Sequence, residues 1–274
     1  MSTNPGLAAG GQSDADLNRV LYVVPAGLIL GVIGVVIAVT HDPAPSLVVR
    51  YIAVGLAYLA GGYWLSAKGY GRLGLLLALT GAFWFVPELE DSGQRYLVGL
   101  AILLESAYFA TYAHAALAYP SGKIRPKGGV WLLRAGYAIV FLGGLARALT
   151  YQPYYWQSCD CPHNGFAVWH SQSLYDAIDG TFGALLLIFG IVLIAVIALK
   201  LQPENRDRAA ALPVWAALVG TTLIVVSGVA RDQLDLSHSG LILWLWVEGI
   251  GLLLAGFSFL VLGRNQSSQA EPSL

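Results

Sequence analysis

Apolar runs alternate with short polar segments along almost the whole chain. Several runs approach about 20 residues, the length an α-helix needs to cross a hydrocarbon layer roughly 30 Å thick. Lipid offers the backbone no hydrogen bonds, so each crossing run must be helical. The pattern predicts these spans: Val20 to Thr40, Arg50 to Ala67, Leu73 to Val86, Tyr96 to Tyr119, Trp131 to Leu149, Leu174 to Leu201, Ala209 to Ala230 and Ser239 to Leu262.

The expected fold class is an all-α integral membrane protein with about eight transmembrane helices. Composition agrees, since 57% of the residues are hydrophobic and 11% are charged, against about 25% charged in a typical soluble domain. Leu73 to Val86 is the shortest span, and a count of seven follows if it enters the membrane and returns on the same side. We expect disordered tails at residues 1–18 and 265–274, flanking a membrane domain at 19–264.

Basic residues predict the orientation, because Lys and Arg in short loops tend to stay in the cytoplasm. The decisive residues follow alternate spans and are Lys68, Arg72, Lys123, Arg125, Lys127, Lys200, Arg206 and Arg208. With eight spans, these loops and both termini lie on one side. We therefore expect cytoplasmic termini in a multi-pass protein of the inner (cytoplasmic) membrane, surrounded by the lipid bilayer.

Several function classes are excluded by missing residues. A retinal protein needs a lysine deep in a span, whereas the lysines lie at span ends, and only His114 lies within a span, which argues against a bis-histidine haem. No phosphate-binding loop, HExxH or GxSxG motif is present. The net charge of -1 gives no basic surface for nucleic acid. We expect no retinal, no nucleic-acid partner and no catalytic residues.

One sequence motif resembles a known family. YFATYAHAALAYPSGKIRP at Tyr108 to Pro126 looks like the HALLAFPSGR segment of actinobacterial sensor histidine kinases. RLGLLLALTGAFWFVP at Arg72 to Pro87 is similar to the helix before it, and CDCPHNGFAV at Cys159 to Val168 resembles their Cys-Pro-x-Asn loop. NRDRAAALPV at Asn205 to Val214 resembles a later basic loop of the same membrane regions.

The resemblance implies a membrane-embedded sensing region without its kinase domain. The family continues into a dimerisation helix, a phosphoacceptor histidine and an ATP-binding domain, whereas ten residues follow Arg264 here. We therefore expect a non-enzymatic sensor or accessory subunit that signals to a separate partner chain. A structural subunit of a respiratory or photosynthetic complex is one alternative, and an ion or proton carrier is another.

Soft metal-binding side chains gather in the loop expected outside the cell between the fifth and sixth spans. Cys159, Cys161 and His163 are alternate residues, and His170 follows. Thiolate and imidazole ligands suit copper or zinc. A disulfide within this tight Cys-x-Cys pair, pairing with another chain, or no special role remain alternatives.

Complementary charges lie near the outer ends of three spans. Arg147 ends the fifth span, Asp176 and Asp179 lie in the first turns of the sixth, and Arg231 and Asp232 end the seventh. The two aspartates share one helical face and lie near a helix N-terminus, which favours carboxylates. We expect an ion-pair network that connects these helices.

Two acids lie about ten residues inside their spans. Glu105 and Glu248 should share a depth near the midplane, where an ionised carboxylate costs at least about 2.5–3.5 kcal/mol. Tyr108, at i+3, is the expected donor to Glu105, whereas His114 falls on the opposite side. We expect both acids to be buried and protonated, and Gly251 and Ala255 beside Glu248 to permit close helix approach.

A metal measurement tests the outer ligand cluster. We expect about one copper or zinc ion per chain after equilibration, and much less in a Cys159→Ser, Cys161→Ser variant, because cysteine supplies the soft ligands. Elemental analysis of both purified proteins checks this. Equal metal content in the two would contradict it.

Chemical labelling tests the orientation. Single cysteines at Lys123 and Arg206, in a background with Cys159 and Cys161 replaced by serine, should react with a membrane-impermeant thiol reagent only after cells are opened, because basic loops stay inside. Labelling of either cysteine in intact cells would reverse the assignment.

Overall fold

The computed structural model describes residues 6–40, 45–119, 123–124, 127–152, 163–199, 208–233 and 237–267, and this part of the chain is helical without strands. Its elements are α1 Gly6–Thr40, α2 Pro45–Ala67, α3 Gly71–Trp84, the 3-10 helix η1 Pro87–Ser92, α4 Arg95–Leu104, α5 Ala107–Ala118, α6 Lys127–Thr150, α8 Gln172–Leu199, α9 Arg208–Gln233 and α10 His238–Ser267.

The all-helical membrane architecture expected from the sequence is confirmed. Among the described residues, seven helical segments are long and apolar enough to cross a membrane. The expected span Ala209 to Ala230 lies in α9, where the apolar stretch is shorter, at Val214–Ala230. The total of eight spans and the cytoplasmic location of the termini stay predictions.

Three boundaries differ from the sequence prediction. The first helix begins at Gly6, inside the segment expected to be a tail. The third span ends at Trp84 and continues as η1, which starts with Pro87 and stops at Gly93 in the left-handed region, φ 69°. The fourth span is not one helix, because Ser106 leaves the helical region with φ -95° and ψ 7° and separates α4 from α5.

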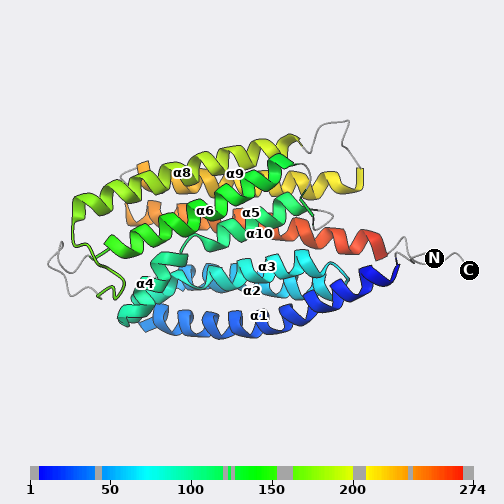
Figure 1. Ribbon diagram of the computed structural model, residues 1–274, viewed down its shortest axis with the longest axis horizontal. Helices are drawn as coiled ribbons and strands as arrows, with labels where there is room; N and C mark the ends of the chain where they lie inside the picture. Colours follow the sequence, from blue (N-terminus) through cyan, green and yellow to red (C-terminus); the bar gives the residue numbers. More distant parts are fainter. Residues whose placement is uncertain are drawn as a thin grey trace, which may run out of the picture.

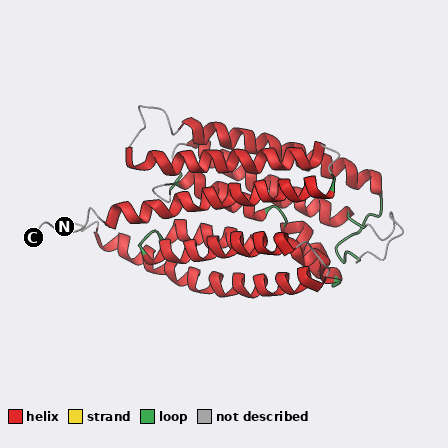
Figure 2. Cartoon of the chain, turned by 180° about the vertical axis from the view of Figure 1, so that it is seen from behind, coloured by secondary structure: helices red, strands yellow, loops and turns green. Residues whose placement is uncertain are grey.

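The long helices run side by side along one axis (Figures 1 and 2). Successive packing of α2, α3, α5, α6, α8, α9 and α10 closes a ring, since α10 returns to α2, and α1 packs outside this ring against α2 and α3. We call the end with η1, α4 and the α6–α8 connection the loop end. The opposite end, where α1 starts and α10 finishes, is the terminal end (Figure 1).

Glycines allow two helix pairs in this ring to approach closely. A Cβ atom at Gly62 of α2 would lie 2.6 Å from the carbonyl oxygen of Gly74 in α3. A Cβ atom at Gly251 of α10 would lie 2.8 Å from the carbonyl oxygen of Gly220 in α9. Because lipid tails are as apolar as the helices, such close van der Waals packing drives helix association in membranes. The predicted close approach at Gly251 is confirmed.

Buried tyrosines join helices that are far apart in the sequence, both around and across the ring. The Tyr58 hydroxyl of α2 donates to the Leu252 carbonyl of α10 at 2.8 Å. The Tyr112 hydroxyl of α5 lies 2.6 Å from Thr221 Oγ1 of α9. Both rings are almost fully buried, so each hydroxyl needs such a partner. The interior of the ring is therefore packed with side chains that also connect distant helices.

Candidate functional site

The first polar cluster lies near the loop end, around Arg147 of α6. Its Nη1 donates to Glu105 Oε2 at 2.5 Å, and its Nε lies 2.7 Å from Asp179 Oδ1 of α8 as an ion contact. The guanidinium carbon is also 5.2 Å from the centre of the Phe182 ring. The Arg147 side chain is 13% exposed, whereas those of Glu105 and Asp179 are 42% and 45% exposed. One shielded cation therefore joins two accessible carboxylates. We call these residues the Arg147 cluster.

Aromatic hydroxyls and a further acid extend the Arg147 cluster. Tyr151, just beyond α6, packs its ring 5.1 Å from that of Tyr175 in α8. Burial raises the pKa of Tyr151, and the neighbouring carboxylate of Glu90 raises it further, so this phenol stays neutral at physiological pH. Glu90 also interacts electrostatically with Arg147. The cluster thus receives groups from η1, the α4–α5 junction, α6 and α8.

Asn164 attaches the returning part of the α6–α8 connection to the bundle. It is buried, and its Nδ2 donates to the carbonyl oxygens of Ala148 at 2.7 Å and Tyr151 at 3.0 Å. Its Oδ1 accepts from the Phe166 backbone at 2.9 Å, and its own N–H donates to Gln152 Oε1 at 2.9 Å. The amide is thus satisfied on both sides. Movement of this connection would reach the end of α6, which carries Arg147.

The second polar cluster joins α2, α3, α5 and α10. The Tyr108 hydroxyl donates to Glu248 Oε1 at 2.5 Å, and Arg50 Nη1 lies 3.7 Å from Glu248 Oε2. Arg50 also donates to the Leu245 carbonyl oxygen at 2.8 Å and lies over the Trp84 ring at 5.2 Å. The side chains of Arg50 and Glu248 are 11% and 5% exposed. We call these residues the Arg50 cluster.

Two short segments touch both clusters. At the α4–α5 junction, Glu105 binds Arg147, and Tyr108, one turn later, binds Glu248. In η1, Glu88 interacts electrostatically with Arg50 and Glu90 with Arg147. The α4–α5 junction therefore connects the Arg147 cluster to the Arg50 cluster by direct contacts, and the carboxylates of η1 add electrostatic interactions with both arginines.

The structure pairs the predicted intramembrane residues differently from the sequence prediction. Tyr108 as donor to Glu105 is wrong, because the helix break separates them and Tyr108 binds Glu248. Each acid instead faces a guanidinium, which does not support the hypothesis that both are neutral. The expected burial is confirmed for Glu248, which is 5% exposed, and is wrong for Glu105, which is 42% exposed. His114 lies away from both acids, as expected, with Nδ1 3.1 Å from the Tyr137 hydroxyl.

The other predicted residues have mixed outcomes. Arg147 and Asp179 meet as an ion pair, whereas Asp176 is exposed and makes no ion pair within the described part of the chain. The side chains of Arg231 and Asp232 lie outside the described residues.

The proposed metal ligands are also only partly covered. Cys159 and Cys161 lie outside the described residues, whereas His163 and His170 are exposed. His163 Nδ1 lies 3.5 Å from Gln152 Nε2. The described ranges contain no group of three or more potential metal ligands, and the proposed copper or zinc site is therefore untested.

Sequence reasoning missed Arg50, Trp84 and Asn164 as site residues. Arg50 was counted only as the first residue of a span, although an arginine entering an apolar run is itself a signal of a buried partner. Asn164 had a signal too, because it is the asparagine of the Cys-Pro-x-Asn resemblance. Trp84 had a similar signal, because it belongs to the Trp-Phe ending of the Arg72 to Pro87 segment in the same resemblance.

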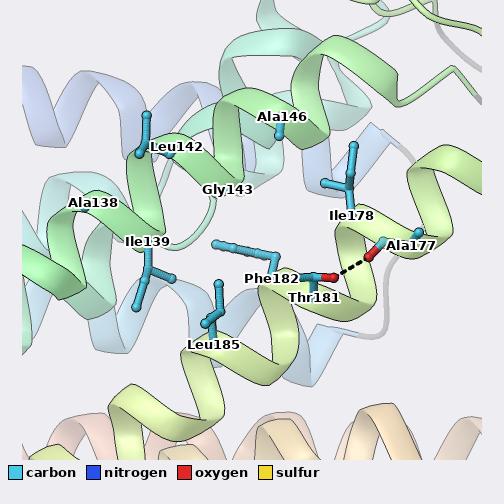
Figure 3. Close-up of a pocket in the computed structure, with 10 residues that line it drawn as sticks. All are labelled: Ala138, Ile139, Leu142, Gly143, Ala146, Ala177, Ile178, Thr181, Phe182 and Leu185. Atoms are coloured by element: carbon cyan, nitrogen blue, oxygen red, sulfur yellow. Dashed lines mark hydrogen bonds between the residues drawn. The ribbon is translucent and has the colours of Figure 1, made fainter.

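An apolar groove borders the Arg147 cluster between α6 and α8 (Figure 3). It has a volume of about 540 Å³ and runs along Ala138 to Ala146 on α6 and Ala177 to Leu185 on α8. Thr181 supplies the one hydroxyl of the lining, which is bound to the Ala177 carbonyl oxygen of its own helix at 2.7 Å. The groove therefore presents a mainly apolar surface to an occupant.

Comparisons with known proteins find no relative. No family model matches the chain, and no curated protein or solved structure matches it either.

A stability measurement tests the charge pairing at Glu248. We expect Glu248→Gln to lower the free energy of unfolding in detergent by about 3–5 kcal/mol, because glutamine keeps the shape but leaves the buried Arg50 cation without this carboxylate. Titration with a denaturing detergent, followed by circular dichroism, measures the change.

A second substitution serves as the control for this prediction. Adding Arg50→Met removes the uncompensated cation, so the double variant should regain at least part of the lost stability. Unchanged stability of Glu248→Gln would instead support the original hypothesis of a neutral, hydrogen-bonding acid.

Proposed function

We propose that this chain is a non-enzymatic membrane signalling protein, a sensor or accessory subunit that acts through a separate partner chain. The observation that carries this proposal is the α4–α5 junction, where Glu105 and Tyr108 connect the Arg147 cluster to the Arg50 cluster. In this proposal the loop end faces the outside and the terminal end faces the cytoplasm. The resemblance to actinobacterial sensor histidine kinases supports the same class.

The ion pairs at Arg147 provide part of the free energy that switching needs. Removing one partner of a buried pair costs about 3–5 kcal/mol. Moving a two-state equilibrium from 1:99 to 99:1 takes about 5.5 kcal/mol. Arg147 is shielded, but the carboxylates of Glu105 and Asp179 are 42% and 45% exposed, so displacing either one changes the free energy by less than the cost for a buried pair and supplies only part of this shift. The rearrangement would pass through the junction to Tyr108 and Glu248, and from there to α2 and α10.

The outer connection suggests where a stimulus enters. Asn164 ties it to the end of α6, and the proposed copper or zinc ligands Cys159, Cys161, His163 and His170 belong to the same connection. Metal binding there would act on Arg147 through the backbone of α6.

An ion or proton carrier is the second candidate. Ionisable residues within a membrane often mark ion or proton pathways, and Arg50, Tyr108 and Glu248 form such a group. We favour signalling because backbone carbonyl and aromatic contacts also hold Arg50 in place. Loss of transport in Glu248→Gln, measured in proteoliposomes, would favour the carrier.

A distance measurement tests coupling between the two ends. Spin labels on cysteines at Lys68 and Leu199, in the Cys159→Ser, Cys161→Ser background, report the separation of α2 and α8 towards the terminal end. We expect Arg147→Met to shift or broaden the distance distribution from pulsed electron paramagnetic resonance, because it releases Glu105 and Asp179. The matched control is Arg134→Met, since Arg134 is an exposed arginine on the same helix.

Two outcomes would count against the signalling proposal. An unchanged distance distribution in a folded Arg147→Met protein would show that the loop end does not influence the terminal end.

Crosslinking in native membranes, followed by mass spectrometry, should identify a partner with a phosphotransfer or gene-regulatory module. If the chain is instead recovered in equal amounts with respiratory or photosynthetic subunits, the result would support the structural-subunit alternative.

A further inference from the structure

The groove between α6 and α8 has the form of a site for one extended hydrocarbon chain. The two helices contribute residues with the same spacing, including Ala138, Leu142 and Ala146 on α6 and Ala177, Thr181 and Leu185 on α8 (Figure 3). Eight helical residues correspond to a length of about 12 Å. Small alanines on both helices leave the space that larger side chains would fill. An acyl chain matches this apolar lining, and the groove accommodates part of its length.

The charge at one end of the groove favours a particular head group. Ala146 precedes Arg147 in sequence, and Phe182 both lines the groove and lies beneath the guanidinium. Arg147 is shielded, whereas the carboxylates of Glu105 and Asp179 are more than 40% exposed. The accessible charge here is therefore negative, and it complements an ammonium group.

Contact geometry links occupancy of the groove to the Arg147 cluster. A Cβ atom at Gly143 of α6 would lie 2.7 Å from Cε2 of Phe182 in α8. The glycine therefore leaves room for the phenylalanine ring. Phe182 is buried, lines the groove and lies 5.2 Å from the guanidinium carbon of Arg147. An occupant that presses on the ring would change the cation contact and, with it, the pairs to Glu105 and Asp179.

We propose that the α6–α8 groove binds a bilayer lipid with an amine head group, with an acyl chain along the groove and the ammonium near Glu105 and Asp179. Such a lipid is the chemical class of stimulus for the Arg147 cluster. This regulatory part rests on the proposed signalling function, whereas lipid binding itself does not.

Binding of defined lipids to the purified full chain tests the proposal. Native mass spectrometry from mixed micelles would compare phosphatidylethanolamine with phosphatidylcholine and phosphatidylglycerol of identical acyl chains. We expect phosphatidylethanolamine to bind about tenfold more tightly than phosphatidylglycerol, which corresponds to about 1.4 kcal/mol. Equal affinity for all three lipids would overturn the head-group assignment.

Matched leucine substitutions test the location. Ala138→Leu with Ala177→Leu fills the groove at exposed positions and should weaken phosphatidylethanolamine binding about tenfold. Ala135→Leu with Ala184→Leu changes exposed alanines of the same helices that lie outside the groove lining. This control should leave phosphatidylethanolamine binding unchanged. Equal binding by both double variants would overturn the groove site. Such a failure would leave the spin-label result, and hence the signalling proposal, standing.

Discussion

A guanidinium group placed among apolar helices must have a counter-charge and hydrogen-bond acceptors nearby, and much of this structure follows from that constraint at Arg147 and Arg50. Each arginine takes its partners from other helices, so neutralising the charge also fastens the ring. Leucine contacts alone would hold these helices without selecting one arrangement, because lipid tails compete equally for apolar surfaces. The ion pairs therefore contribute specificity where hydrophobic burial contributes little.

The two clusters differ in a way that suits different roles. Glu248 is buried and held by Tyr108 as well as Arg50, so its surroundings resist change. Glu105 and Asp179 remain accessible beside a shielded Arg147. A site that must respond needs groups that can exchange partners, and the Arg147 cluster has them. In the proposed signalling function, the Arg50 cluster would hold the arrangement that the junction imposes.

The sequence predicted the helices well and the polar contacts only in part. Long apolar runs identify spans because bilayer thickness sets their length. Arg147 and Asp179 could be paired because their charges are opposite and both lie near the outer ends of their spans. The pairing of Glu105 failed because i, i+3 neighbours share a face only in an unbroken helix, and no Pro or Gly marks the break at Ser106. Arg50 and Glu248 lie almost 200 residues apart, and only the closure of the ring brings them together.

This separation along the chain has a consequence for biogenesis. Arg50 lies in α2, and the Leu245 carbonyl that it binds lies 195 positions later, in α10. Because the ribosome delivers helices in order, Arg50 enters the membrane long before Glu248 exists. The early helices must therefore hold an incompletely neutralised cation against Trp84 and Glu88 while the rest of the chain is synthesised. Insertion of α10 is then the step that completes charge compensation at Arg50, because it supplies both Glu248 and the Leu245 carbonyl oxygen.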